Sequence, residues 1–314
     1  MEKKKILLYI CVVLTIINTL TLAYLITALL RQSPEDHPSS LLLPVSEPPH
    51  SDVYMPDSIS LAGEKVPLHR IDVAEALKKE LIVNSYLHSH TIQILKTAPR
   101  TFAIIEPILK AHGIPDDFKY LAVIESRLNP LIVSPAGAAS VWQIMKATGK
   151  ELGLEINNEV DERYHLEKST VAAADYLRKS YEKFGSWTLA AASYNAGNHF
   201  LTKQMDQQDE HNYYNLLLGE ETGRYVFRIL ALKQIMNHPE RYNFEVDAIL
   251  PPEEVTYVEV NTSIKNWAAF AHQHGITYKT LKRFNPWLRK NELHNNRHKT
   301  YRIAIPVNKE LYRS

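Results

Sequence analysis

The chain reads IPDDFKYLAVIES from Ile114 to Ser126, and this stretch predicts an amphipathic helix with one charge on its apolar face. The proline presets the dihedral φ, and the two aspartates suit the positive end of a helix. Phe118, Leu121 and Ala122 follow the i, i+3, i+4 spacing of one face, and Glu125 occupies i+7. Glu125 is therefore expected to face the core, where a carboxyl keeps its proton to higher pH, as a general acid must. The alternative is a stripe that ends one turn earlier and leaves Glu125 solvated.

Helical periodicity dominates the chain from about residue 71 to residue 237. Apolar residues recur at helix spacing in seven segments that we predict to be helices: Ile71–Thr97, Thr101–His112, Pro115–Arg127, Val141–Leu152, Glu167–Phe184, Trp187–Ala196 and Glu221–Asn237. A glycine follows four of them, at residues 113, 153, 185 and 197, where helices commonly end in the left-handed conformation. Together they predict one all-α domain over residues 68–245.

The amino terminus carries a long uncharged segment. Residues 6–30 contain no charge, and as a helix these 25 residues would span ~37 Å, more than the ~30 Å hydrocarbon core of a bilayer. Residues 1–5 form a basic tail with three lysines, so we expect the tail in the cytoplasm and the rest of the chain outside. The length favours an uncleaved transmembrane anchor over a signal peptide, whose apolar core is usually ~7–15 residues, although cleavage stays an alternative.

A proline-rich segment follows the predicted anchor. Residues 31–67 hold seven of the seventeen prolines, which disfavours a regular helix and predicts a semi-extended tether. The alternative is an arm that packs irregularly on the next domain, with Ser58–Val66 as the part that docks.

The last part of the chain, residues 250–314, changes character. Val255–Val260 and Thr300–Pro306 alternate like strands, and Trp267–His274 and Tyr278–Asn285 look like two short helices. This βααβ order resembles a lysin-motif (LysM) module, a small α+β fold that binds glycans. The usual Gly-Asp-Thr after the first strand is replaced by Asn261–Ser263, so a working module and a retained fold with weakened binding both stay open.

Composition excludes several classes of protein. Lys plus Arg (36) nearly cancels Asp plus Glu (35), so no excess of charge points to nucleic acid. A single cysteine rules out an internal disulfide or a multi-cysteine metal site. The sequence has no GxGxxG, P-loop or HExxH pattern, so we expect neither a nucleotide cofactor nor a metal.

Two charged segments are expected to be solvated surface. The first is acidic and contains Glu151, Glu155, Glu159, Asp161 and Glu162. The second is the basic run Arg289–Lys299, for which contact with an anionic glycan or phospholipid is the alternative.

Four short motifs accompany Glu125 in a fixed order. They are Ser126–Pro130 (SRLNP), Ser134–Gln143 (SPAGAASVWQ), Ser193–Gly197 (SYNAG) and Glu221–Val226 (ETGRYV). Singly, such pieces are ordinary turns and helix ends. In combination they resemble the signature of the lytic transglycosylases of glycoside hydrolase family 23, relatives of goose-type lysozyme. The resemblance implies a mainly α fold, with a lysozyme-like all-α catalytic domain between the anchor and the LysM-like module.

The resemblance also implies a chemistry that needs one carboxyl group. In this family a glutamate protonates the β-1,4 bond between N-acetylmuramic acid and N-acetylglucosamine of peptidoglycan. The same residue then deprotonates the C6 hydroxyl of the sugar, which attacks C1 and leaves a 1,6-anhydro end. Glu125 matches the position of this single acid and base. A glycosidase with two catalytic carboxylates would need a second one close by, and the sequence offers no obvious candidate near Glu125.

Seven further residues match positions of the family's site: Ser134, Gln143, Met145, Tyr194, Asn195, Glu221 and Tyr225. The resemblance implies that Ser134 and Gln143 bind the sugar near the cleaved bond and that Met145 lines the pocket. Tyr194 and Asn195 would hold substrate and glutamate from the opposite wall, and Glu221 and Tyr225 would position sugar or support the site. One departure is Ser140, where the family has glycine and where a side chain is expected to narrow the cleft or reshape the backbone.

We therefore expect a single-pass enzyme of the inner membrane whose catalytic domain faces the periplasm. Its expected partners are peptidoglycan glycan strands, the membrane itself and unnamed proteins of cell-wall synthesis or division, but not nucleic acid. Two alternatives stay open. One is a hydrolytic muramidase that cuts the same bond with water, and the other is a noncatalytic peptidoglycan-binding scaffold.

Overall fold

The computed structural model describes Thr27 and residues 52–312 of the chain. The predicted basic tail, the anchor over residues 6–30 and the tether up to residue 51 therefore lie outside the described residues, Thr27 excepted. Within the described part, no helix is both long enough and apolar enough to cross a membrane. The chain from Val53 onward forms one compact unit.

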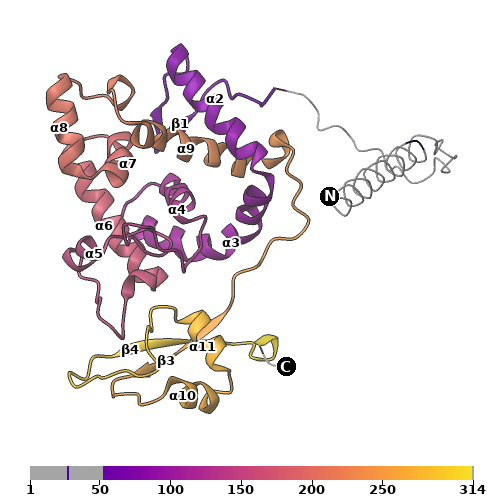
Figure 1. Cartoon of the computed structure of the whole chain (residues 1–314), viewed down its shortest axis with the longest axis vertical. Coiled ribbons are helices and arrows are strands. Elements are labelled where there is room, and N and C mark those ends of the chain that lie inside the picture. The colour runs from indigo at the N-terminus through magenta and orange to yellow at the C-terminus, as the bar shows by residue number, and fades with distance from the viewer. Residues whose placement is uncertain (1–26, 28–51, 313–314) are drawn as a thin grey trace, which may run out of the picture. The chain divides into compact units, whose positions relative to one another are not determined.

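This unit is mainly helical, which confirms the predicted class (Figure 1). Its first eight helices are α2 Ile71–Tyr86, α3 His88–Ala111, α4 Lys119–Ser126, α5 Lys146–Glu151, α6 Leu166–Phe184, α7 Trp187–Ala196, α8 Asn198–Gln208 and α9 Glu220–Asn237. Short 3-10 turns lie at Asp116–Phe118, Glu162–Tyr164, Tyr213–Asn215, Pro239–Tyr242 and Glu310–Tyr312.

Helix α4 supports the predicted site. It packs against α3 and α9 and lies in the middle of the helical domain (Figure 1). Phe118, Leu121 and Ala122 are fully buried, which confirms the apolar stripe that ends at Glu125. The predicted helix from Pro115 is shorter, because its first turn is a 3-10 turn.

Three other helices differ from prediction. The predicted helix Val141–Leu152 begins only at Lys146, because the residues before it form a turn with left-handed φ angles at Ser140 and Gln143. The first predicted helix breaks at Leu87, whose ψ of 48° is not helical, and α3 then continues through Pro99 and Pro107. A proline inside a helix removes one hydrogen bond, a loss that the burial of one face of α3 offsets. Helix α8 is absent from the prediction because only Leu201 and Met205 are buried on it, a stripe too narrow to detect by periodicity.

The end of the predicted tether packs on the helical domain. Strands β1 (Ser60–Leu61) and β2 (Glu64–Lys65) form a small antiparallel hairpin, and Leu61 is fully buried. Glu64 accepts hydrogen bonds from the backbone N–H groups of Trp187 at 2.6 Å and Thr188 at 2.9 Å, the first residues of α7. The structure therefore favours the docked-arm alternative for this segment.

The C-terminal part has the predicted βααβ order. Strands β3 (Val255–Val260) and β4 (Tyr301–Pro306) pair antiparallel, with Val258 opposite Ile303, and helices α10 (Trp267–Gln273) and α11 (Tyr278–Phe284) lie between them in sequence. Trp267, Leu281 and Ile303 are buried in a second hydrophobic cluster.

Of the five residues in the acidic segment, Glu151 is exposed, as predicted, whereas the other four are partly or fully buried, contrary to prediction. Asp161 and Glu162 are buried, and Ala139, Val160 and Tyr164 of the helical domain share the hydrophobic cluster of the C-terminal part. The backbone N–H of Asp161 donates to the carbonyl of Trp287 at 2.9 Å. The prediction failed because the partner of this segment is more than a hundred residues away in sequence.

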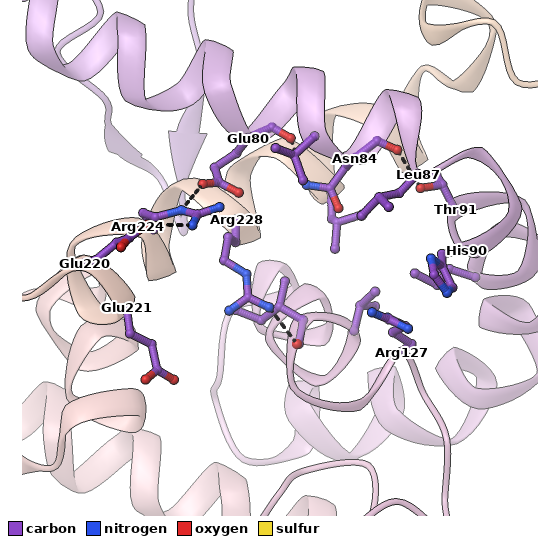
Figure 2. A pocket seen from close by; sticks show the side chains of 15 residues that line it. Glu80, Asn84, Leu87, His90, Thr91, Arg127, Glu220, Glu221, Arg224 and Arg228 are labelled. Atoms are coloured by element: carbon purple, nitrogen blue, oxygen red, sulfur yellow. Dashed lines mark hydrogen bonds and ion pairs between the residues drawn. The ribbon is translucent and has the colours of Figure 1, made fainter. Parts of the chain in front are cut away.

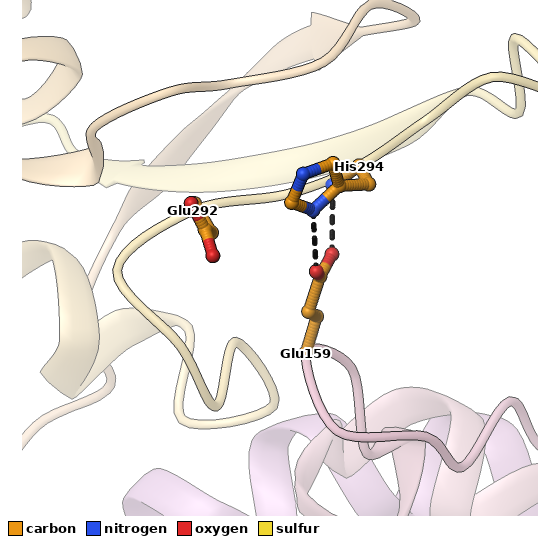
Figure 3. Close-up of side chains that lie close together, drawn as sticks. All are labelled: Glu159, Glu292 and His294. Carbon is orange, nitrogen blue, oxygen red and sulfur yellow. Dashed lines mark hydrogen bonds and ion pairs between the residues drawn. The ribbon is translucent and has the colours of Figure 1, made fainter.

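The charged residues of the basic run Arg289–Lys299 are exposed, as predicted, and some of them also contact the helical domain. Lys299 binds Glu155 at 2.5 Å, and the carboxylate of Glu159 accepts from the backbone N–H of His294 at 2.7 Å and contacts its Nδ1 at 2.6 Å (Figure 3). The hydrogen bond to Glu159 raises the pKa of His294. Glu292, also in Figure 3, offers an oxygen within 4.8 Å of the ligand atoms of this pair, but both groups of the pair are already engaged with each other.

Candidate active site

Glu125 lies in the last turn of α4, partly buried, and accepts a hydrogen bond from the phenol of Tyr225 on α9. Burial raises the pKa of Glu125, against the lowering effects of the Tyr225 hydrogen bond and the Arg228 charge; the charge of Glu221 adds to the rise. The negative end of the α4 dipole also disfavours an ionised carboxylate at this position. The carboxyl group is thus biased toward its protonated form.

A tight turn ends α4 directly after Glu125. Arg127 and Leu128 both take left-handed φ angles, 53° and 60°, although neither is glycine. Such conformations cost roughly 1–2 kcal/mol per residue, so the surrounding contacts must hold them. Leu128 is buried, which anchors the turn.

Two tyrosines flank Glu125, of which Tyr225 is buried and Tyr194 is partly buried. Tyr225 is 1% exposed, and Tyr194 of α7 donates its hydroxyl to the carbonyl of Trp142 at 2.7 Å. Burial first, and the Glu125 charge second, raise the pKa of both phenols well above the usual value. Both hydroxyls therefore stay protonated and act as hydrogen-bond donors.

The segment from Ile132 to Ile144 folds back on itself and carries Ser134 and Gln143. The Ser134 hydroxyl accepts from the backbone N–H of Ala138 at 3.0 Å, which leaves its own proton to donate. The side-chain amide of Gln143 donates to the carbonyls of Ser140 at 2.7 Å and Ile132 at 3.3 Å. With its N–H group held by the backbone, Gln143 retains its amide oxygen as an acceptor.

Ser140 has a φ of 68°, in the left-handed region that glycine adopts without strain. Its side chain is 1% exposed, so it does not project from the surface into a cleft. The cost of serine at this position is therefore backbone strain. The strained residue lies in the turn where the Ser140 carbonyl accepts a hydrogen bond from the Gln143 side chain.

Sequence reasoning missed Arg163, which organises the same segment. Its guanidinium donates to the carbonyls of Gly137 at 2.8 Å and Ile144 at 3.1 Å, and it forms a buried ion pair with Asp161 at 2.8 Å. Arg163 therefore fastens both ends of the turn between Ser134 and Gln143 to the acidic segment. No local pattern marks this role, because the two carbonyl groups that Arg163 binds lie 26 and 19 residues away in sequence.

Asn195 links α7 to the start of α9. Its side-chain amide donates to Glu221 at 3.1 Å, and its oxygen accepts from the Thr222 hydroxyl at 2.9 Å. Glu221 is exposed, and its charge acts on Glu125. Met145, just before α5, is 43% exposed.

The structure thus brings together Glu125, Tyr194 and Tyr225 around one carboxyl group and pairs Asn195 with Glu221. Ser134 and Gln143 share one turn, connected to Tyr194 through the carbonyl of Trp142. Met145 directly follows that turn, and its carbonyl accepts from the backbone N–H of Gly149 at 2.8 Å in the first turn of α5.

Comparison with known proteins gives two family matches. Residues 102–217 match the transglycosylase SLT domain. Residues 256–309 match the soluble lytic transglycosylase C-terminal LysM-like domain. The first match contains Glu125, Ser134, Gln143, Met145, Tyr194 and Asn195.

One curated relative is the membrane-bound lytic murein transglycosylase D of Escherichia coli K12, 29% identical over 218 residues, which are 68% of this chain and 47% of the relative. The chain thus covers about half the length of that relative. Among solved structures, the 70 kDa soluble lytic transglycosylase of Escherichia coli is 22% identical over 43% of this chain and 24% of its own, with a TM-score of 0.37. An inactive variant of the lytic transglycosylase Slt of Pseudomonas aeruginosa is 18% identical over 45% of this chain and 24% of its own, with a TM-score of 0.35.

Proposed function

We propose that this chain, which carries a transglycosylase SLT domain and a LysM-like domain, is a peptidoglycan lytic transglycosylase. In this proposal Glu125 is its sole general acid and base. The observation that carries the proposal is the environment of Glu125. It is a partly buried carboxyl group with a raised pKa, in contact with a phenol that stays protonated.

In the first step, Glu125 donates its proton to the oxygen between N-acetylmuramic acid and N-acetylglucosamine, and the C1–O bond breaks. The carboxylate formed is stabilised by the hydrogen bond from Tyr225 and the charge of Arg228. By the family resemblance, the substrate's acetamido oxygen shields C1 at this stage.

In the second step, the Glu125 carboxylate takes the proton of the muramic acid C6 hydroxyl, whose oxygen bonds to C1. The product has a 1,6-anhydro end, and Glu125 regains its proton. An attacking group already attached to the substrate has a high effective molarity, so it outcompetes water in a shielded site. A second catalytic carboxylate is not needed, and Glu221 is already bound to Asn195.

The remaining site residues bind and orient the sugar. Ser134 offers a hydroxyl proton and Gln143 an amide oxygen, two groups that suit sugar hydroxyl and acetamido groups. Tyr194 and Asn195, in the last turn of α7, form the wall on the other side of Glu125, and Met145 offers apolar contact.

We also propose that residues 6–30 anchor the enzyme in the inner membrane, with residues 1–5 in the cytoplasm and the catalytic domain in the periplasm. The uncharged segment and the lysines before it support this arrangement. The curated relative is itself described as membrane-bound. Because the chain packs on the helical domain from Val53 onward, the proposed tether comprises only about residues 31–52.

The test compares wild type, Glu125→Gln and Glu240→Gln on purified sacculi, with the products identified by mass spectrometry. Glu240 is a matched control because its side chain is 68% exposed and lies after α9. Wild type and Glu240→Gln should release anhydro-ended fragments, and Glu125→Gln should be slower by at least ~10²-fold. Equal release by Glu125→Gln would exclude catalysis by this residue. Fragments with reducing ends would identify a hydrolytic muramidase instead.

A further inference from the structure

Two regions adjoin Glu125, and they differ in their contact with the C-terminal part of the chain. The first is a pocket of about 580 Å³ lined by residues of α2, α3, α4 and α9 and their ends (Figure 2). Within the part of the chain that the structure describes, the C-terminal part contributes no lining residue to this pocket. The second region is the turn that carries Ser134 and Gln143. Ala139, in this turn, is fully buried in the hydrophobic cluster of the C-terminal part.

The acidic segment next to this turn is bound to the C-terminal part along its backbone. The N–H of Asp161 donates to the carbonyl of Trp287 at 2.9 Å, and the N–H of Arg289 donates to the carbonyl of Glu159 at 2.7 Å. Val160, between the two bonded residues, is fully buried in the same hydrophobic cluster. Residues 159–161 are thus held by the C-terminal part much as an added strand would be.

Two side chains of the C-terminal part hold the other end of the acidic segment. Lys299 binds Glu155 at 2.5 Å, and the phenol of Tyr301 lies 3.1 and 3.0 Å from the two oxygens of the same carboxylate. The backbone N–H of Glu155 donates to the carboxylate of Glu162 at 2.8 Å, and its carbonyl accepts from the N–H of Glu162 at 2.9 Å. The position of Glu155 therefore sets that of Glu162, the neighbour of Asp161.

Arg163 connects the acidic segment to the turn. Its Nε and Nη2 donate to the carboxylate of Asp161 at 3.0 and 2.8 Å, and its Nη1 donates to the carbonyls of Gly137 at 2.8 Å and Ile144 at 3.1 Å. A guanidinium group is planar, so its donors keep a fixed arrangement. A displacement of Asp161 therefore displaces the donor that holds both ends of the turn.

We propose that Lys299 and Tyr301 are positioning residues of the active site. They hold the acidic segment in place, and through Arg163 they hold the turn that presents Ser134 and Gln143 to the sugar. The inference rests on the proposed function, in which these two side chains bind the sugar near the cleaved bond. The C-terminal part then contributes to the reaction without itself binding glycan. Positioning affects short and long substrates alike, whereas glycan binding by the C-terminal part affects only long strands.

The experiment measures kcat and KM of two double variants on sacculi and on a soluble tetrasaccharide fragment of peptidoglycan. Lys299→Gln with Tyr301→Phe removes an ion pair and a phenol hydrogen bond to the acidic segment. Arg283→Gln with Tyr312→Phe is the matched control, because Arg283 and Lys299 are both 43% exposed and because Arg283 and Tyr312 share one carboxylate, that of Glu253, outside the acidic segment.

In the double variant of Lys299 and Tyr301, KM should rise about 3- to 10-fold on both substrates, with kcat within about twofold of wild type, because loosened sugar-binding groups weaken binding of substrate and transition state alike. The control should keep the wild-type KM on both. Thermal unfolding should show similar losses of stability in the two double variants, so that a difference in KM reports the position of the turn. Tyr301→Phe alone keeps the buried ring and should give part of the rise.

A third variant tests the route through the turn. In a Gln143→Ala background, the changes at Lys299 and Tyr301 should raise KM by less than about a further twofold, because both sets of changes act on one group of contacts. A full further rise in this background would show that the turn is not the route.

Other outcomes would also overturn the proposal. A rise in KM confined to sacculi would assign the effect to glycan binding by the C-terminal part, and equal KM values of the two double variants would exclude a positioning role. If wild type released no product from either substrate, the proposed function would fail and the positioning role with it. None of the other outcomes contradicts the proposed function.

Discussion

Tyr225 on α9 donates its phenol hydrogen bond to Glu125 on α4, across 100 residues of sequence. This hydrogen bond lowers the pKa of Glu125, whereas burial raises it, because a donor stabilises the charged carboxylate that burial disfavours. Glu125 is thereby held as an acid that can still become a carboxylate during the reaction.

Removing that donor should shift the pH dependence of the enzyme. In Tyr225→Phe the pKa of Glu125 should rise further, since the lowering hydrogen bond is lost and burial remains. The alkaline limb of the rate profile should move to higher pH, and the rate at the optimum should fall by about tenfold through the loss of ~1.5 kcal/mol of carboxylate stabilisation. Release of anhydro-ended fragments at a series of pH values measures both effects. Tyr120→Phe, which loses a hydrogen bond to Asn237 instead, should keep the wild-type profile.

Glu125 should also reduce the stability of the fold at neutral pH. Its pKa is raised in the folded state, so its contribution to stability is fully present below the unfolded pKa of about 4.5 and is lost as the pH rises through the folded pKa. Glu125→Gln should therefore be more stable than wild type at pH 8, by about 0.5–1 kcal/mol, and equal to it at pH 4. Urea unfolding at both pH values provides the measurement, and a variant less stable at pH 8 would contradict the assigned burial.

Ser140→Gly should stabilise the protein. The φ of 68° at Ser140 strains any residue with a Cβ atom, whereas glycine adopts it freely. We expect a gain of about 0.5–1 kcal/mol in the free energy of unfolding, because the relief of left-handed strain exceeds the greater backbone entropy that glycine loses on folding, with activity equal to or above that of wild type. Ser140→Ala is the matched control because it keeps the Cβ atom and should bring no gain. Stabilisation by alanine as well would show that the hydroxyl, not the backbone, is the cause.

Arg163→Gln should weaken both the fold and the substrate turn. The variant leaves the buried Asp161 carboxylate without its partner and frees the carbonyls of Gly137 and Ile144, a class of change that costs about 3–5 kcal/mol. Guanidinium denaturation should show this loss, and KM for sacculi should rise in any folded fraction. The surface pair of Arg178 offers a comparison, since Arg178→Gln should cost less than ~1 kcal/mol. Similar losses of stability in Arg163→Gln and Arg178→Gln would contradict the role of Arg163 in holding the turn that carries Ser134 and Gln143.

Glu64→Ala should destabilise α7. Glu64 accepts from the hydroxyls of Ser186 at 2.9 Å and Thr188 at 2.5 Å as well as from two backbone N–H groups at the start of the helix. Loss of a helix cap typically costs ~1–2 kcal/mol. Thermal unfolding of Glu64→Ala beside Lys65→Ala, an exposed neighbour, gives the comparison. Equal melting temperatures would mean that the arm is not part of the stable fold.

Sequence by itself determined the features that depend on near neighbours. The helical class, the buried stripe of α4, the helix ends at Gly185 and Gly197 and the βααβ order all follow from spacing within a few residues. The position of Glu125 at the end of that stripe belongs to the same category. The motif order supplied the candidate site residues, although their roles remain predictions.

Only the tertiary structure decided the rest, because those features depend on groups far apart in the chain. Three contacts join segments that share no local pattern. Glu64 binds the start of α7, Arg163 binds the turn that carries Ser134 and Gln143, and Glu159 pairs with His294. The left-handed φ of Ser140 is likewise imposed by the turn around it, against the preference of serine. Charge and carbonyl partners are set by proximity in space, which periodicity along the chain does not encode.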